Sequence, residues 1–284
     1  MKCDFQLEKK LADNAPDLSK RIKDTAFVMT QALDKYTTYF PDYTDHSVLH
    51  SLQVIDFANR LVGEQIDMLN VDEIYILLMS CYLHDTGMGI SDADYKALRD
   101  KVLSKEYILA HPKEDIKNAI RDFHHEFSGQ FIRKYASLFD IPSEEYVYAI
   151  IQVSRGHRKT NLLDEKEYPV DYKLPNGNTV CLPYLAAIIR LADELDIAED
   201  RNILFEDINN DIPSFQKHHA VKHLEMFEDR FELTVCLDGL NESVKNMVLE
   251  ENIKLRQMVK DLRSIVEKRT DFRISQKDVV EHFI

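Results

Sequence analysis

The stretch VDEIYILLMSCYLHDTGMG, residues 71–89, is the clearest guide to the fold of this chain. From Ile74 to Leu83 the residues are apolar around almost the whole helical circumference, which predicts a central, buried helix. The run covers only about half of the ~20 residues that a membrane-spanning helix needs. It ends at adjacent His84 and Asp85, before a turn that two glycines permit. A histidine next to an aspartate at the end of a buried helix is therefore the first candidate for chemistry.

Segments on both sides of this helix carry apolar residues at intervals of three and four, the pattern of amphipathic helices. Such helices are predicted over residues 17–40, 49–62, 92–110, 114–138, 143–154 and 183–195. Between the last two, Pro169, Pro175 and the turn-forming pair Asn176-Gly177 predict a small hairpin with flanks at 170–172 and 179–182.

Beyond residue 210 the pattern changes. Phe231, Leu233, Val235 and Leu237 alternate with polar residues, which predicts a half-buried strand, and residues 221–227 are expected to pair with it. A long helix is predicted over 241–268. The last element, residues 275–283, begins with a serine suited to a helix N-cap and is expected to be helical.

These patterns predict an all-α helical core with a small α+β C-terminal appendage. We expect an N-terminal helix over 1–40 that packs on the core, a core domain over 41–210, and a C-terminal hairpin plus long helix over 211–284. Within the core domain, residues 160–182 form a hairpin-like insertion and are a candidate lid.

Composition excludes some partners. The 284 residues include 36 Lys and Arg against 50 Asp and Glu, a formal charge of −14. This acidic balance argues against an extended nucleic-acid surface, but not against a small anionic substrate, because bound divalent metals reverse the local field. Four scattered cysteines, no apolar leader and no membrane-length run predict a cytoplasmic protein without a membrane partner. A homo-oligomer stays open, although the apolar seam of 244–266 more often packs within its own domain.

Six histidines and aspartates fall at the ends or on the faces of the predicted helices. They are His50, His84, Asp85, His125, His157 and Asp193. Neighbouring residues at a helix end can point toward two metals, and a carboxylate can bridge two ions where an imidazole cannot. Imidazole and carboxylate together suit several transition metals without selecting one.

The order of these residues resembles the HD superfamily of metal-dependent phosphohydrolases. The resemblance rests on the motif His50-Ser51-x-x-Val54, the His84-Asp85 pair, and RLADELD at 190–196. Together with HEFSGQFI at 125–132 and GHR at 156–158, the order H…HD…H…H…D is similar to the five-histidine branch. The resemblance covers about residues 45–201. No GYP sequence follows the fourth histidine segment, so the branch specific for cyclic-di-GMP is not supported.

The resemblance implies two divalent metal ions, drawn from Mn, Fe, Zn, Ni, Co or Mg. One ion would be held by His50, His84, Asp85 and Asp193, and the other by Asp85 as the bridge with His125 and His157. The implied activity is hydrolysis of a phosphoester or phosphoanhydride bond in a small nucleotide-type substrate. It would be phosphodiesterase-like, with a hydroxide that bridges the metals as nucleophile.

Two further histidines are candidates for a catalytic proton donor beside Asp85. His46 lies one helical turn before His50 and would share its helix face, although a turn residue packed near the site is the alternative. His124 precedes His125; we assign the ligand role to His125 because the residues after it fit the motif. His124 is then a neighbouring group or a general acid.

Basic residues near the motif are candidates for substrate binding. They are Arg155, Arg158, Lys159, Arg201 and Lys217. The three around the fourth histidine would hold phosphate oxygens, Arg201 would orient a carboxylate such as Asp196 or Glu194, and Lys217 belongs to a small basic patch. The alternative for each is an ordinary solvated residue.

Two other functions remain open at this level. Some proteins with the same ligand set hold two irons and activate oxygen to cleave C–C or C–P bonds. Alternatively, the chain is a non-catalytic, metal-dependent sensing or protein-interaction module. All six ligand positions are filled, which favours catalysis, because a site without catalytic function does not need the complete set of ligands.

Overall fold

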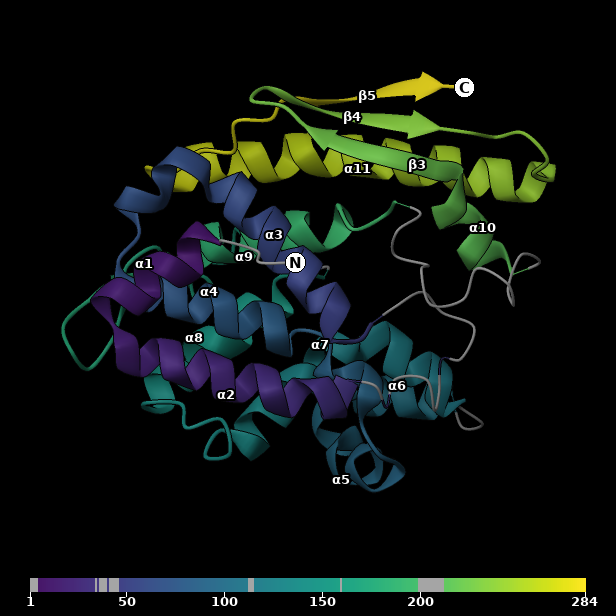
Figure 1. Cartoon of the computed structure of the whole chain (residues 1–284). Helices are drawn as coiled ribbons and strands as arrows, with labels where there is room; N and C mark the ends of the chain where they lie inside the picture. The colour runs from purple at the N-terminus through teal and green to yellow at the C-terminus, as the bar shows by residue number, and fades with distance from the viewer. Residues whose placement is uncertain are drawn as a thin grey trace.

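The structure, a computed structural model, describes residues 5–33, 35, 40, 46–111, 115–158, 160–198 and 212–284. It confirms an all-α core with a small α+β appendage (Figure 1). The core contains α1 (Gln6–Asn14), α2 (Pro16–Ala32), α3 (Val48–Val62), α4 (Val71–Leu83), α5 (Asp92–Val102), α6 (Lys105–Ala110), α7 (Ile116–Tyr135), α8 (Glu144–Arg155) and α9 (Leu182–Glu194), with the 3-10 turns η2 (Gly63–Met68) and η3 (Thr86–Gly89).

Helix α4 is the central element, as its sequence predicts. Every side chain from Asp72 to Leu83 is buried, and the helix packs against α1, α2, α3, α8 and α9. It begins with a capping box in which Asn70 accepts hydrogen bonds from the N–H groups of the first turn and Glu73 accepts one from Asn70. The other Glu73 oxygen accepts a hydrogen bond from the N–H of Cys181 at 3.0 Å. This contact ties the start of α4 to the start of α9.

The end of α4 is tied to α7 through the turn η3. The N–H of Gly87 donates to Ser128 Oγ at 2.8 Å, and Ser128 Oγ donates to the carbonyl oxygen of His84 at 2.5 Å. A Cβ atom on Gly87 would lie 2.1 Å from the carbonyl oxygen of His124. Only glycine therefore permits this approach, which brings the middle of α7 against the His84-Asp85 pair.

The predicted hairpin forms, with β1 (Tyr172–Lys173) antiparallel to β2 (Thr179–Val180). Its turn residues Asn176 and Asn178 each donate a side-chain hydrogen bond to Asp72 Oδ2, at 2.8 and 2.6 Å. Asp72 lies at the start of α4, and a helix of this length separates it from His84 by about 20 Å. That distance argues against a lid role for the hairpin tip.

The appendage contains α10 (Pro213–Ala220), β3 (Val221–Met226), β4 (Arg230–Val235), α11 (Glu242–Arg269) and β5 (Asp278–Phe283). Strands β3 and β4 pair antiparallel, as expected from the alternation in β4. The helical expectation for 275–283 is wrong: β5 pairs parallel to β4, with Val279 opposite Phe231. The open edge of β4 offers backbone partners and a place to bury Val279, and these outweigh the local N-cap signal.

The appendage packs on the core without a break in the apolar interior. Helix α11 contacts α9, and Figure 1 shows α11 and the sheet along one side of the helical bundle. Gln65 of η2 donates to the carbonyl oxygen of Arg273 and accepts from its N–H, at 2.7 and 2.8 Å. One cluster of buried apolar residues, from Phe5 to Val279, includes members of both parts, while a second, smaller cluster around Tyr95, Ile120 and Phe127 lies within the core. Among the described residues, no helix is long and apolar enough to cross a membrane.

Candidate metal centre

The candidate residues gather where several helices begin or end. His84 caps the C-terminus of α4 and Asp85 follows it, while His50 lies in the first turn of α3. His157 follows the C-terminus of α8, and Asp193 lies in the last turn of α9. Helix ends lack a complete set of neighbouring turns, so side chains from different helices can approach one another there.

Asp85 is shared between two pairs of histidines. Its Oδ2 atom lies 3.6 Å from His50 Nε2 and 3.4 Å from His84 Nε2. Its Oδ1 atom lies 3.6 Å from both His124 Nε2 and His157 Nε2. The ligand atoms of each pair and Asp85 lie within 4.8 Å of one another, so the residues form two candidate metal groups that share one carboxylate.

Asp193 joins the first group. Its Oδ1 atom lies 3.1 Å from His50 Nε2 and 3.7 Å from His84 Nε2. With 18 % of its side chain exposed, Asp193 is more open to solvent than Asp85 or these two histidines. The cluster is therefore accessible from the Asp193 side.

The second ring nitrogen of three cluster histidines faces a backbone carbonyl three residues earlier. His84 Nδ1 lies 2.9 Å from the oxygen of Cys81, and His157 Nδ1 lies 2.5 Å from the oxygen of Ser154. His124 Nδ1 lies 2.8 Å from the corresponding oxygen of residue 121. A carbonyl only accepts hydrogen bonds, so in each neutral ring Nδ1 carries the proton and Nε2 keeps a lone pair.

These lone pairs face one another and the carboxylates. His124 Nε2 lies 2.9 Å from His157 Nε2, and His84 Nε2 lies 3.3 Å from His50 Nε2. Buried acceptors that face each other repel unless a cation lies between them. The donor set of imidazole nitrogens and carboxylate oxygens therefore fits divalent transition metals, although it does not select one.

The electrostatic setting agrees with this fit. Burial alone would raise the pKa of Asp85, but the imidazoles of His84, His46, His124 and His157 outweigh it and hold the pKa well below its usual range. Asp85 is therefore an anion at neutral pH, which is the form that binds metals.

The histidines differ in how they respond to burial. Burial, together with the rings of His84 and His124, lowers the pKa of His157 well below its ordinary value. Burial also acts to lower the pKa of His84, but the charges of Asp85 and Asp193 outweigh it and raise the pKa. Without a metal ion, the His84 ring therefore tends to bind a proton, and that proton would supply the positive charge that a metal ion supplies when bound.

The ring that lies against Asp85 and His157 belongs to His124, and not to His125, the residue expected there from the sequence. His125 Nδ1 is buried without a hydrogen-bond partner among the described residues, and His125 Nε2 lies 3.6 Å from Glu126 Oε1. Burial and the neighbouring positive groups lower the pKa of His125 to about 3. The physical reason for the difference is helical phase, because successive residues point about 100° apart.

A signal for His124 was present in the sequence of α7. The residues of α7 that turn inward include Ile120, His124, Phe127 and Ser128, at intervals of four, three and one. His124 belongs to that stripe and His125 lies beside it. Matching the motif HEFSGQFI led to the wrong neighbour, while the apolar period of the helix indicates the right one.

The other predicted proton donor, His46, lies just before α3 and is half-buried. Its ring centre is 5.7 Å from that of His50, and its charge contributes to the low pKa of Asp85. His46 is thus next to the first metal group, and its role as a proton donor stays a prediction.

The predicted substrate-binding cations divide into two kinds. Arg155 is already paired, because its Nε and Nη2 donate to Glu126 Oε1 at 3.0 and 2.7 Å. The guanidinium of Arg158 has no hydrogen-bond or ion-pair partner among the described residues, and its charge acts on His124. Lys217 of α10 lies 3.7 Å from Glu251 Oε1 of α11. Lys159 and Arg201 lie outside the described residues.

One contact of the cluster was not predicted. Asp196 Oδ2 lies 2.6 Å from His50 Nδ1, and both residues are buried. The sequence predicts for Asp196 only a contact with Arg201. The motif RLADELD contains both aspartates, but nothing in its spacing indicates that the second one faces a histidine of α3.

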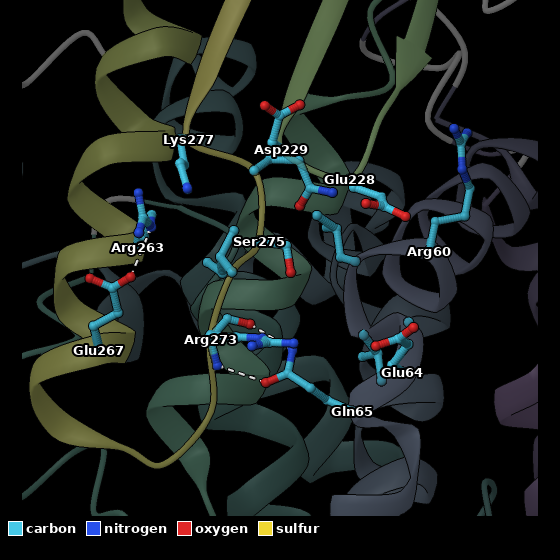
Figure 2. Close-up of a pocket in the computed structure, with 15 residues that line it drawn as sticks. Arg60, Glu64, Gln65, Glu228, Asp229, Arg263, Glu267, Arg273, Ser275 and Lys277 are labelled. Carbon is cyan, nitrogen blue, oxygen red and sulfur yellow. Dashed lines mark hydrogen bonds and ion pairs between the residues drawn. The ribbon is translucent and has the colours of Figure 1, made fainter.

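A separate polar cavity of about 690 Å³ lies between η2, the β3–β4 turn and the segment that follows α11 (Figure 2). Charged side chains of both signs line it, including Arg60, Glu64, Asp229, Arg263 and Lys277. None of the histidines or aspartates of the metal cluster lines this cavity. Because its charges are balanced, we assign no ligand to it.

The helical core and the shared-carboxylate cluster define an HD-type domain with a candidate metal site. The chain belongs to the HD-CE family, whose model matches residues 40–269. The match extends from the residues before α3 to the end of α11 and so includes most of the appendage. The resemblance to the HD superfamily is confirmed. Among curated proteins, none matches the chain significantly.

Proposed function

We propose that this protein is a metal-dependent phosphohydrolase that cleaves a phosphoester or phosphoanhydride bond in a small nucleotide-type substrate. The observation that carries the proposal is the position of Asp85, whose two oxygens face two separate histidine pairs. Divalent metal ions bound by these groups supply activated water at neutral pH and neutralise charge on phosphoryl oxygens.

The chain itself would hold the ions in two groups. His50, His84, Asp85 and Asp193 form the first, and Asp85, His124 and His157 form the second. The backbone carbonyls that fix Nδ1 of three of these rings keep each Nε2 directed at the centre. Preorganised ligands of this kind need no rearrangement during the reaction.

Arg158 is the residue best suited to hold the substrate phosphate. It is half-buried, it has no partner among the described residues, and its charge acts on both His124 and Glu194. Glu194 follows Asp193, the most open member of the first group, so the charge of Arg158 acts near the more open side of the cluster. A free guanidinium there would form charge-assisted hydrogen bonds with phosphate oxygens.

His46 is the group that we assign to proton transfer. It is half-buried beside His50, on the rim of the first metal group rather than inside it. A histidine in such a position can protonate the oxygen of the leaving group. The assignment of His46 replaces that of His124, whose ring nitrogens are both committed within the cluster.

A compact substrate is favoured over a long polyanion. The chain has a formal charge of −14, while Arg158 and the metal ions that the cluster would hold bring positive charge to one place. Long nucleic acids would meet the negative surface, whereas a mononucleotide or a dinucleotide needs only the cluster.

The test begins with protein purified without chelators. Metal content is measured by mass spectrometry, and hydrolysis is measured against cyclic mononucleotides, cyclic dinucleotides, deoxynucleoside triphosphates and a simple phosphodiester. We expect bound divalent metal and phosphate-bond cleavage. Asp85→Ala should keep its helical circular dichroism but lose metal and activity, while Asp122→Ala, an exposed change on α7, should keep both.

Two results would contradict the proposal. Full hydrolysis by Asp85→Ala would remove the cluster from the reaction. Bound iron with oxygen uptake and no phosphate release would indicate the di-iron oxygenase instead, since the donor set also suits iron.

A further inference from the structure

The four histidines of the cluster are not oriented in the same way. His84, His124 and His157 each direct Nδ1 at a neutral backbone carbonyl three residues earlier in the same segment. His50 directs Nδ1 at the carboxylate of Asp196, 146 residues further along the chain. The first metal group thus contains one imidazole with an anionic partner, and the second group contains none.

The position of His50 in its helix explains the difference. A helical side chain leans toward the turn that precedes it, where the carbonyl three residues earlier is within reach. His50 is the third residue of α3, and the residue three positions earlier is Ser47, the N-cap. The carbonyl oxygen of Ser47 already accepts a hydrogen bond from the N–H of Ser51 at 3.3 Å. The His50 ring instead has its partner in the segment that follows α9.

We propose that Asp196 is a positioning residue that fixes the orientation and tautomer of His50 and strengthens it as a metal ligand. The inference rests on the proposed function only in requiring that the cluster binds metal. A carboxylate behind a metal-binding imidazole holds the proton on Nδ1 and increases the electron density at Nε2. His50 Nε2 is the atom that faces Asp85 and Asp193.

The chain around Asp196 is built to hold it in this place. Asp196 is 4 % exposed, and its N–H donates to the carbonyl oxygen of Asp193 at 3.2 Å. The turn at the end of α9 therefore supplies both carboxylates that contact the His50 ring. Asp193 lies at Nε2 and Asp196 lies at Nδ1. Moving either aspartate moves the other, so the two contacts to His50 are set together.

Residues of the appendage lie near this contact. Asp196 lines a cavity of about 390 Å³ whose walls include Gln53 and Asp56 of α3 and Lys222 and His223 of β3. Residues of strand β3 thus line the same cavity as Asp196.

The consequence is that the two metal groups have unequal affinities. Removal of Asp196 should weaken the first group and leave the second unchanged. The second group takes no ligand from α3, because its members come from the end of α4, from α7 and from the end of α8.

The experiment uses the full chain, stripped of metal and titrated with Mn²⁺ in competition with a chelator. We expect Asp196→Ala to lose roughly 10- to 100-fold in affinity for one of two ions, which is the usual effect of removing such a partner. Asp196→Asn keeps an oxygen that can accept from Nδ1 and should show a smaller loss. Asp56→Asn, which changes a carboxylate in the same cavity that does not contact His50, should match the wild type.

A second readout separates positioning from a structural role. The Nδ1 proton of His50, hydrogen-bonded to a carboxylate at 2.6 Å, should give a far-downfield proton resonance that disappears in Asp196→Ala while thermal stability and circular dichroism change little.

Each failure has a distinct meaning. Wild-type affinity for both ions in Asp196→Ala would overturn the positioning role while leaving the proposed function intact. An equal loss at both ions together with a lower melting temperature would show that Asp196 is structural, and would also overturn the inference. A wild-type chain that binds no ion would overturn the proposed function and this inference together.

Discussion

His124 Nε2 and His157 Nε2 lie 2.9 Å apart, although each ring has its proton directed at a backbone carbonyl through Nδ1. Two lone pairs at this separation in a buried site favour a cation, and Asp85 Oδ1 completes the group at 3.6 Å from both nitrogens. The relationship marks the second candidate metal group without reference to any relative. It also makes the neighbouring residues His124 and His125 clearly different in role.

The first prediction concerns this pair of neighbours. His124→Ala should lower the metal content by about one ion per chain, because it removes a ligand of the second group. His125→Ala should keep the wild-type metal content, because His125 belongs to neither group of candidate ligands. Metal analysis of the two variants, purified in parallel, checks the assignment. The opposite pattern would restore His125 as the ligand.

The second prediction concerns the close approach at η3. Gly87→Ala should destabilise the fold by about 1–3 kcal/mol or more, because the new methyl group would meet the backbone oxygen of His124 at 2.1 Å. Gly129→Ala, a change in α7, would bring the new methyl group to 3.1 Å from a side-chain methyl of Ile151 and should cost less. Chemical denaturation of both variants measures the difference. Equal costs would mean that α7 is not held against η3 as described.

The third prediction concerns substrate binding. Arg158→Ala should raise KM for a phosphorylated substrate by roughly 10- to 100-fold with a smaller effect on kcat, because a charge-assisted hydrogen bond contributes about 1.5–3 kcal/mol. Arg155→Ala should instead lower thermal stability, since it leaves Glu126 without its partner. Steady-state kinetics and thermal melts of both variants test this. An unchanged KM for Arg158→Ala would remove it from the substrate site.

The fourth prediction concerns pH and the start of α4. Burial outweighs the hydrogen bonds from the N–H groups of Cys181 and Asn70, and it raises the pKa of Glu73 above 4.5. Between 4.5 and the raised pKa, the folded protein holds a proton that the unfolded chain has lost. The contribution of Glu73 to stability is therefore complete below pH 4.5 and falls as pH rises through the raised pKa.

The measurement compares the unfolding free energy of the wild type with that of Glu73→Gln, which cannot titrate. The difference, wild type minus variant, should fall as pH rises through that window and then become constant. Taking the difference cancels the titration of the metal cluster. A difference that increases with pH would mean that the hydrogen bonds outweigh burial.

The fifth prediction concerns metal and stability. Ligands that bind only the folded state stabilise it by about 2.7 kcal/mol at 100 times their Kd. Adding Mn²⁺ to stripped protein should therefore raise Tm, and a chelator should reverse the rise. Asp85→Ala should show no such response, because both groups lose their shared carboxylate. A metal-dependent Tm that survives in Asp85→Ala would place the binding elsewhere in the chain.

Much of the fold was predictable because the signals are local. The apolar run of α4, the alternation in β4 and the Asn176-Gly177 turn each specify their structure within a few residues. The strand β5 was not predictable in this way. Its partner β4 is more than forty residues away in the chain. The local sequence instead favours a helix, because Ser275 is a typical helix N-cap residue.

For the metal centre, the sequence by itself determined which kinds of ligand are present and the order in which they occur. Residue type and spacing are enough to indicate His50, the His84-Asp85 pair, His157 and Asp193. The apolar period of α7 favours His124 over His125, and the tertiary structure decided the choice, since it depends on how α7 is rotated against η3. It also decided the partner of His50. The contact with Asp196 joins two helix ends that are remote in sequence, and no local pattern can encode which of them meet.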